Sequence, residues 1–140
     1  MKEKLFLDTN VVLDLLGERE SFYKPMARIA TMADNKEIQL VTAALSFPTI
    51  FYILTKFESR AIVLDKLQKF KALTDIADLT NHILNKGLVS GFSDFEDSLQ
   101  YHCALQSKCN MILSRNFKGF KRSSIPVMTP DEYLAVCNNR

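Results

Sequence analysis

Short apolar runs alternate with segments of helical periodicity along the chain. The runs are rich in branched and other apolar side chains, which predicts strands at residues 5–8, 38–41, 111–114 and 126–128. Between them apolar residues recur every three or four positions, which predicts helices at residues 11–16, 23–35, 46–57, 60–73, 79–85, 94–108 and 130–136. Residues 74–78 fit either a connector or a weak strand. The alternation predicts an α/β fold, a three-layer α/β/α sandwich around a central, mainly parallel sheet.

Two of the predicted helices have explicit start signals. Ser93 and Glu96 have the spacing of a capping box, in which each side chain accepts a hydrogen bond from the other residue's backbone N–H. Thr129 and Glu132 repeat this spacing, with Pro130 at the first helical position. No linker, internal repeat or low-complexity tract interrupts the 140 residues. We therefore expect a single domain over residues 1–140, long enough to bury a core without disulfides.

Composition and charge are those of an ordinary soluble protein, with 47% hydrophobic and 24% charged residues. The net charge is only +2, so any attraction to nucleic acid has to come from a local patch. The clearest patch consists of Arg115, Lys118, Lys121 and Arg122, with no acid among them. A solvated loop without a ligand would show the same pattern, so both interpretations stay open here.

The cysteines and the N-terminus indicate the compartment. Three cysteines, an odd number without metal-type spacing, are typical of reduced thiols. The first residues lead directly into a predicted strand without a signal peptide. No apolar run approaches the roughly 20 residues that are needed to cross a bilayer. We expect a soluble, cytoplasmic protein with no membrane partner.

Aspartates mark two elements that we expect to meet at one edge of the sheet. Asp8 ends the first strand, and open α/β folds place their sites at the carboxyl ends of their strands. Asp94 and Asp97 lie three residues apart at the start of a later helix, so both lie on one helix face. Carboxylate oxygens suit hard cations. We therefore predict Mg²⁺ or Mn²⁺ at Asp8 and Asp97, with Asp94 supporting the metal or orienting a water.

Each of these acids also has a local explanation. Asp8 can cap the helix that follows it, although Thr9 and Asn10 are equally suitable caps. An acid in a first helical turn, such as Asp94, interacts favourably with the helix dipole. Glu96 is explained by the capping box, so we assign it no chemistry.

Asn116 follows the strand predicted at residues 111–114. Its amide oxygen suits a weak metal ligand or a group that orients water, and a turn-forming asparagine fits equally well. His82 and His102 have no partner visible in the sequence, and we interpret both as surface or structural residues. The glycines are scattered, so no phosphate-binding loop is present. The pattern thus favours metal-assisted phosphodiester chemistry.

These motifs, in this order, resemble the PIN domain, the nuclease fold of VapC-type toxins in bacterial toxin–antitoxin pairs. Residues 5–10 resemble its opening strand with the first metal-binding aspartate, 94–100 its downstream aspartate motif, 113–120 its strand-end segment, and 125–132 its final strand and helix. The resemblance implies a Mg²⁺- or Mn²⁺-dependent endoribonuclease that acts on RNA, pairs with an antitoxin and forms a homodimer. It implies catalytic roles for Asp8, Asp94, Asp97 and Asn116, and RNA contacts for Asn10, Arg115, Lys118 and Lys121.

The chain departs from the family pattern at the acidic positions. Active members carry a glutamate early in the helix after the second strand, whereas residues 38–57 contain no acid and Thr49 falls near that position. Asn116 occupies the position of the family's fourth acidic residue, and Gly119 occupies a position where many relatives have another aspartate. With Asn116 as a neutral ligand, one metal fits this inventory, whereas a two-metal clamp is not expected.

Three functions remain open at this point. The first is a toxin-like ribonuclease that uses one metal. The second is a PIN-fold domain that binds RNA but has lost catalysis, which the missing acids favour and the retained aspartates oppose. The third is an interaction domain whose acids serve only as caps and turns.

Overall fold

Parallel strands form the sheet of this protein. The structure, a computed structural model, describes residues 2–138, so residues 1 and 139–140 lie outside it. The strands follow the order β3-β2-β1-β4-β5 across the sheet. They are β1 (Lys4–Leu7), β2 (Gln39–Ala43), β3 (Asp75–Ala77), β4 (Met111–Leu113) and β5 (Val127–Met128), each pair parallel. The expected mainly parallel sheet is confirmed, and residues 74–78 contain a strand, β3, at its edge.

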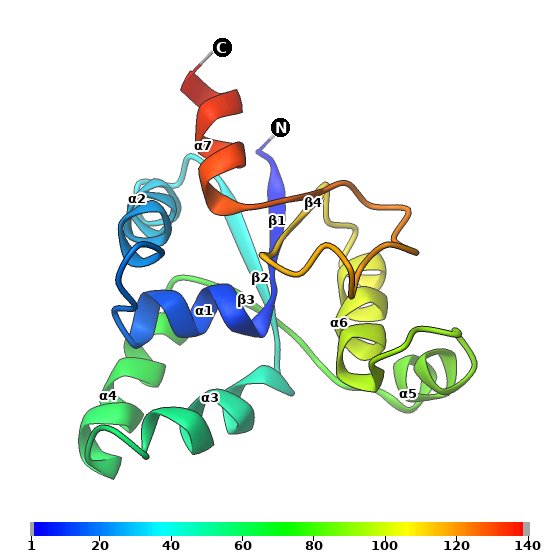
Figure 1. Ribbon diagram of the computed structural model, residues 1–140, viewed down its shortest axis with the longest axis horizontal. Helices are drawn as coiled ribbons and strands as arrows, with labels where there is room; N and C mark the ends of the chain where they lie inside the picture. Colours follow the sequence, from blue (N-terminus) through cyan, green and yellow to red (C-terminus); the bar gives the residue numbers. More distant parts are fainter. Residues whose placement is uncertain (1, 139–140) are drawn as a thin grey trace.

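Helices cover both faces of the sheet. They are α1 (Thr9–Leu16), α2 (Tyr23–Asp34), α3 (Ser46–Leu54), α4 (Arg60–Lys71), α5 (Asn81–Leu88), α6 (Phe95–Gln106) and α7 (Pro130–Asn138). Leu5 and Leu7 of β1 pack with side chains of α1–α4 and α7, whereas Phe6 packs with side chains of α5 and α6. Alternate residues of a strand point to opposite faces, so β1 contributes to both halves of the core. Figure 1 shows α5 and α6 together on the opposite side of the sheet from α1–α4, and the three-layer fold is confirmed.

The two predicted capping boxes have different outcomes. Thr129 and Glu132 form theirs, with the Thr129 N–H donating to Glu132 Oε1 at 2.9 Å and the Glu132 N–H donating to Thr129 Oγ1 at 3.1 Å. The box at Ser93 is wrong, because Asp94 is the N-cap of α6 and its Oδ1 accepts from the Asp97 N–H at 2.9 Å. Aspartate caps a helix as well as serine does, and a start one residue later moves Glu96 out of the position that reaches back to the cap.

One sheet joins strands from Lys4 to Met128. The single domain expected over residues 1–140 stays a prediction. Within residues 2–138, no helix is long and apolar enough to cross a membrane. All three cysteines are free. The carboxyl ends of β1 and β4 lie side by side, and the residues that follow them build the candidate site.

Candidate active site

Asp8 is a buried carboxylate that has only neutral partners. Its side chain is 1% exposed, and its two oxygens accept from Gln100 Nε2 at 3.1 Å and from Ser114 Oγ at 2.8 Å. Burial raises the pKa of Asp8, and the hydrogen bonds from Ser114 and Gln100 oppose this rise only in part. Although Asp8 stands at the N-cap of α1, its side chain makes no capping hydrogen bond, while the nearby backbone of Thr9 and Asn10 lowers its pKa slightly. A role as a cap therefore does not explain Asp8.

Gln100 fixes the position of Asp8 and was missed by the sequence analysis. Its Oε1 accepts from the backbone N–H of Thr9 at 3.0 Å and from Thr9 Oγ1 at 3.2 Å. Since an amide has one acceptor end and one donor end, these bonds direct Nε2 to Asp8. The available signal was spacing, because Gln100 lies one helical turn after Asp97 on the same face of α6.

Asp97, in the first turn of α6, is the second carboxylate of the site. It is 9% exposed, and its Oδ2 accepts from Asn116 Nδ2 at 3.3 Å. Burial raises the pKa of Asp97 to about 7, and the charges of Asp94, Asp8 and Glu96 add to this rise. The structure thus brings the carboxylates of two distant segments close enough to repel one another.

Glu96 belongs to this acidic group, although the sequence analysis assigned it to a cap. Its Oε1 lies 3.3 Å from Thr9 Oγ1, whose single proton it shares with Gln100 Oε1. Burial raises the pKa of the half-buried Glu96, and the charges of Asp94 and Asp8 raise it further, while the bond from Thr9 lowers it. Its spacing of four residues from Gln100 places both on one helix face, which is the signal that could have identified it.

Helix α3 contributes the hydroxyl of Ser46 to the site and carries no acidic residue. Ser46 is the buried first residue of α3. Its Oγ forms a hydrogen bond of 2.7 Å with Thr9 Oγ1. Thr49 follows one turn later and is half-buried. Ser46, Thr9 and Glu96 thus form a chain of hydrogen bonds that links α3 to α6. On this side of the site the carboxylate comes from α6.

Asn116 forms the turn after β4 and at the same time holds Asp97. Its backbone N–H donates to Ser114 Oγ at 2.9 Å, and its Oδ1 accepts from the Gly119 N–H at 3.0 Å. The amide oxygen is therefore committed to the turn, and the end that faces Asp97 is the donor. This arrangement fits a residue that positions Asp97 better than the neutral metal ligand that we expected.

Gly119, at which the family resemblance suggested a further aspartate, packs closely against the site. A Cβ atom built on Gly119 would overlap Asp97 Oδ2 and the Asn116 side chain. An acid at this position would have to displace both side chains. The structure therefore has no room here for a further carboxylate in its present arrangement.

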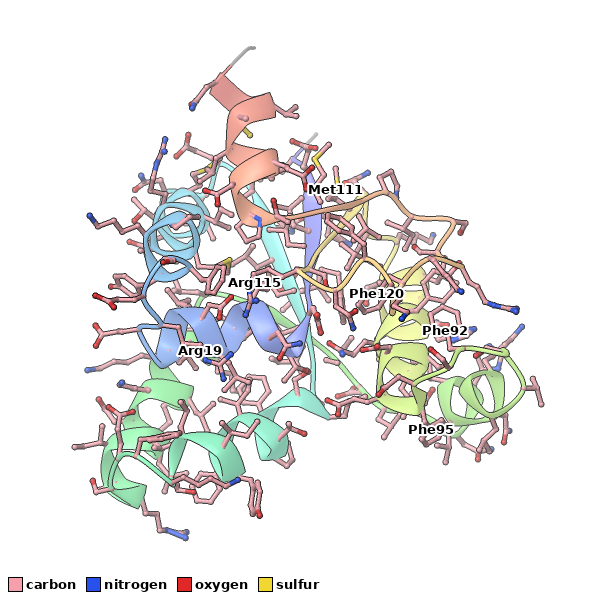
Figure 2. All side chains as sticks on the ribbon, viewed as in Figure 1. Arg19, Phe92, Phe95, Met111, Arg115 and Phe120 are labelled. Atoms are coloured by element: carbon pink, nitrogen blue, oxygen red, sulfur yellow. The ribbon has the colours of Figure 1, made fainter. Side chains whose placement is uncertain are left out.

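Arg115 lies away from the acidic group and binds a different aspartate. Its Nε and Nη2 donate to the two oxygens of Asp14 on α1, at 2.8 and 3.0 Å, and its guanidinium lies 3.8 Å from the ring centre of Phe22. Figure 2 shows Arg115 beside α1. This fork occupies two donors that an RNA phosphate would need, so the contact that we expected between Arg115 and RNA is not favoured. Asn10, Lys118 and Lys121 are exposed, as an RNA contact requires.

The donors of this site fit a hard cation. Asp8, Asp97 and Glu96 offer carboxylate oxygens, and the mutual repulsion that raises the pKa of Asp97 would be relieved by a positive charge. Among residues 2–138, no group of three or more His, Cys, Asp or Glu side chains is arranged to hold a metal ion. Mg²⁺ can bind through one or two carboxylates together with waters and substrate phosphates.

Comparisons with known proteins give a consistent family. Residues 4–118 match the family model described as the PIN domain. "Ribonuclease VapC1" of Aquifex aeolicus is 31% identical in an alignment of 145 positions, which covers 94% of this chain and 93% of the relative.

Similar solved structures share the fold at low identity. VapBC2 from Rickettsia felis, bound to a DNA fragment from its promoter, is 16% identical with a TM-score of 0.66, over 90% of this chain and 98% of that one. FitAcB from Neisseria gonorrhoeae is 13% identical with a TM-score of 0.66, over 90% and 97%. Mycobacterium tuberculosis VapC20, described as a sarcin-ricin loop cleaving toxin, is 8% identical with a TM-score of 0.66, over 84% and 94%.

Proposed function

The chain belongs to the PIN domain family, and we propose that it is a divalent-metal-dependent endoribonuclease of the toxin–antitoxin type. The observation that carries this proposal is the pair of largely buried carboxylates, Asp8 and Asp97, which have neutral hydrogen-bond donors and form no ion pair with any residue between 2 and 138. RNA as the substrate is supported by the name of the 31% identical relative, a ribonuclease.

We propose that Asp8 and Asp97 bind Mg²⁺ or Mn²⁺ and that Glu96 is a third acidic ligand. Glu96 is linked through Thr9 to Ser46 of α3, the helix on which the family resemblance led us to expect a glutamate. When bound, the cation neutralises charge on the scissile phosphate and lowers the pKa of a water for in-line attack. A site with these few carboxylates suits one metal whose binding is assisted by the substrate.

The neighbouring side chains hold these carboxylates in place. Gln100 and Ser114 fix the two oxygens of Asp8, and Asn116 fixes Asp97. Asp94 caps α6 and adds negative charge beside Asp97, so we propose that it supports the site electrostatically. Partners of this kind orient metal ligands, and their loss typically weakens metal binding or activity by roughly 10–100-fold.

RNA would approach over the exposed cations that follow β4. We propose that Lys118 and Lys121 contact backbone phosphates and that Asn10, which is exposed beside Asp8, contacts the RNA near the cleaved bond. Arg115 is left out of this set because Asp14 holds it.

The proposed partner is a cognate antitoxin, and the proposed compartment is the cytoplasm. Several similar structures are toxin–antitoxin complexes, among them a complex from Klebsiella pneumoniae and VapBC from Salmonella typhimurium bound to DNA. Copurification with the product of an adjacent small gene tests the antitoxin. Light scattering of the purified chain tests the homodimer that the family resemblance implies.

RNA cleavage with Mn²⁺ and with chelator tests the enzymatic proposal. Wild type should cleave only with Mn²⁺, and Asp97→Asn should be inactive while remaining folded. The alternative, an RNA-binding domain without catalysis, is favoured by the closed position at Gly119 and by the lack of an acid from α3. Tight RNA binding by wild type with no cleavage in Mn²⁺ or Mg²⁺ would establish the alternative.

A further inference from the structure

A small basic pocket lies next to the acidic site. It has a volume of about 170 Å³ and is lined by residues 91–93 before α6 and by Lys118, Gly119, Lys121 and Arg122 after β4. Gly119 belongs to both regions, because it lines this pocket and also lies against Asp97. Gly119 therefore lies between the pocket and the acidic group.

Both walls of the pocket are anchored on one side chain, Tyr101. The ring of Phe92 stacks on Tyr101 with 5.1 Å between ring centres. From the other wall, the Ser124 N–H donates to the Tyr101 hydroxyl at 3.1 Å, and a second hydrogen bond of 2.9 Å joins the hydroxyl oxygens of Ser124 and Tyr101. Phe120 is buried in the same half of the core, and Figure 2 shows Phe92 and Phe120 both beside α6. This common anchor fixes the two loops relative to each other.

In the part of the chain that the structure describes, the cations of the pocket form no ion pair. None of the ion pairs found within residues 2–138 involves Lys118, Lys121 or Arg122. The guanidinium of Arg122 lies over Gly91, where a Cβ atom would come within 3.1 Å of Nη1. Gly91 has φ +76°, a conformation that other residues rarely adopt, so glycine here serves both the turn and the close approach of Arg122.

The chemistry of the pocket points to one phosphate group. Three unpaired cations and the hydroxyl-bearing Ser93 surround a volume well below the roughly 300–1,000 Å³ of pockets that hold whole drug-sized ligands. A compact anion such as a phosphate group fits this volume. Arginine and lysine donors at such a pocket match the equatorial oxygens of a phosphate.

We propose that Lys118, Lys121, Arg122 and Ser93 bind an internal phosphate of the RNA, next to the phosphate that is cleaved. This inference rests on the proposed function and deepens it, because it fixes where the strand continues beyond the acidic site. It adds Arg122 and Ser93 to the substrate contacts and makes the two lysines parts of one subsite. The cation at Asp8 and Asp97 and the cations of the pocket then neutralise neighbouring phosphates from the two sides of Gly119.

Binding of a short single-stranded RNA in chelator tests the subsite without requiring cleavage. We compare Lys121→Gln and Arg122→Gln with Lys71→Gln, a matched loss of charge at an exposed position on α4. Each pocket variant should weaken binding several-fold at low salt and reduce the slope of log affinity against log salt by about 0.7, the value for one lost contact with a single strand. Equal affinity and slope in pocket variants and Lys71→Gln would overturn the proposal.

Two further arms identify the source of the phosphate and separate the two proposals. The same RNA with a 5′-hydroxyl should bind as well as RNA with a 5′-phosphate; a requirement for the terminal phosphate would overturn the assignment to an internal one. The rise in melting temperature with Mn²⁺ should be the same in Arg122→Gln and wild type. If wild type binds RNA through the pocket but never cleaves it, the enzymatic proposal fails and the phosphate subsite stands.

Discussion

Asp8 and Asp14 are two buried aspartates on neighbouring elements with opposite surroundings. Asp14 is 0% exposed, and Arg115 donates to both of its oxygens while Arg19 Nη1 lies 3.5 Å from Oδ1. Asp8 is 1% exposed, and the side chains that donate hydrogen bonds to it within residues 2–138, Gln100 and Ser114, are neutral. Arg115 thus provides a positive charge beside Asp14, whereas the side chains that bind Asp8 carry no charge.

On the function that we propose, this difference separates a structural aspartate, Asp14, from a metal-binding one, Asp8. Burial of an unpaired charge costs several kcal/mol, so a protein keeps such a charge where a ligand completes it. Asp14 is completed within the fold and joins α1 to the turn after β4. Asp8 is positioned but not neutralised, which fits the binding of an external cation. Similar burial therefore does not mean a similar role.

Replacing Asp8 by asparagine should have the largest effect on activity and almost none on stability. Asparagine keeps an oxygen that can accept from Gln100 and removes the buried charge, so the melting temperature should hold or rise slightly. The cleavage rate should fall by more than the roughly 10–100-fold that loss of an outer partner of a metal ligand costs. Initial rates in Mn²⁺ and thermal melts measure both. A lower melting temperature with unchanged cleavage would show Asp8 to be structural.

Replacing Arg115 by glutamine should have the reverse effect. The change leaves Asp14 buried without its main partner, and loss of one member of a buried ion pair costs about 3–5 kcal/mol. We expect about 3 kcal/mol, since the Arg115 side chain keeps 30% exposure to solvent. Urea unfolding beside the exposed control Lys71→Gln measures it. A loss below about 1 kcal/mol, as for a surface pair, would contradict the assigned role.

Replacing Glu96 by glutamine tests whether α6 supplies the third carboxylate. Glutamine still accepts from Thr9 through its oxygen but carries no charge, so the fold should remain intact. We expect Mn²⁺ binding to weaken by about tenfold, less than for the loss of Asp8 or Asp97. Calorimetric titration with RNA present measures this, with the exposed Glu37→Gln as a matched control. Equal Mn²⁺ affinities in Glu96→Gln and Glu37→Gln would mean that Glu96 does not bind the metal.

The pH dependence of stability should show the uncompensated charge of Asp97. Its pKa is raised to about 7 from an ordinary value of 3.8, so the folded state binds a proton more tightly than the unfolded state. The stability linked to this group is therefore complete below about pH 4 and is lost as the pH rises through 7. In chelator, the melting temperature of wild type should fall relative to that of Asp97→Asn across this range. A constant difference between the two would contradict the raised pKa.

Local patterns predicted the fold, because burial on both faces makes parallel strands into apolar runs that a sequence displays. The positions of Asp8 and Asp97 also followed from pattern, since both stand at the ends of recognisable elements. The strand β3 was ambiguous because it has only three residues at the edge of the sheet and one of them is buried. Its pairing with β2 decides its conformation, and no local signal contains that pairing.

The sequence did not reveal which residues the charged side chains pair with. Arg115 looked like part of a basic patch because Asp14, its partner, lies 101 positions away. Glu96 looked like a cap because the start of α6 was placed one residue too early, and that shift also hid its contact with Thr9. Such assignments depend on which elements pack together, whereas the spacing of residues on one helix only shows that they share a face.

A Mn²⁺ titration followed by thermal melting tests the contrast between the two aspartates most directly. A ligand that binds only the native state raises the melting temperature with concentration. The melting temperature of wild type should rise with Mn²⁺, and Arg115→Gln, starting from a lower value, should rise in parallel. Asp8→Asn should show no rise. An equal rise in wild type and Asp8→Asn would mean that the metal binds elsewhere and would contradict the account.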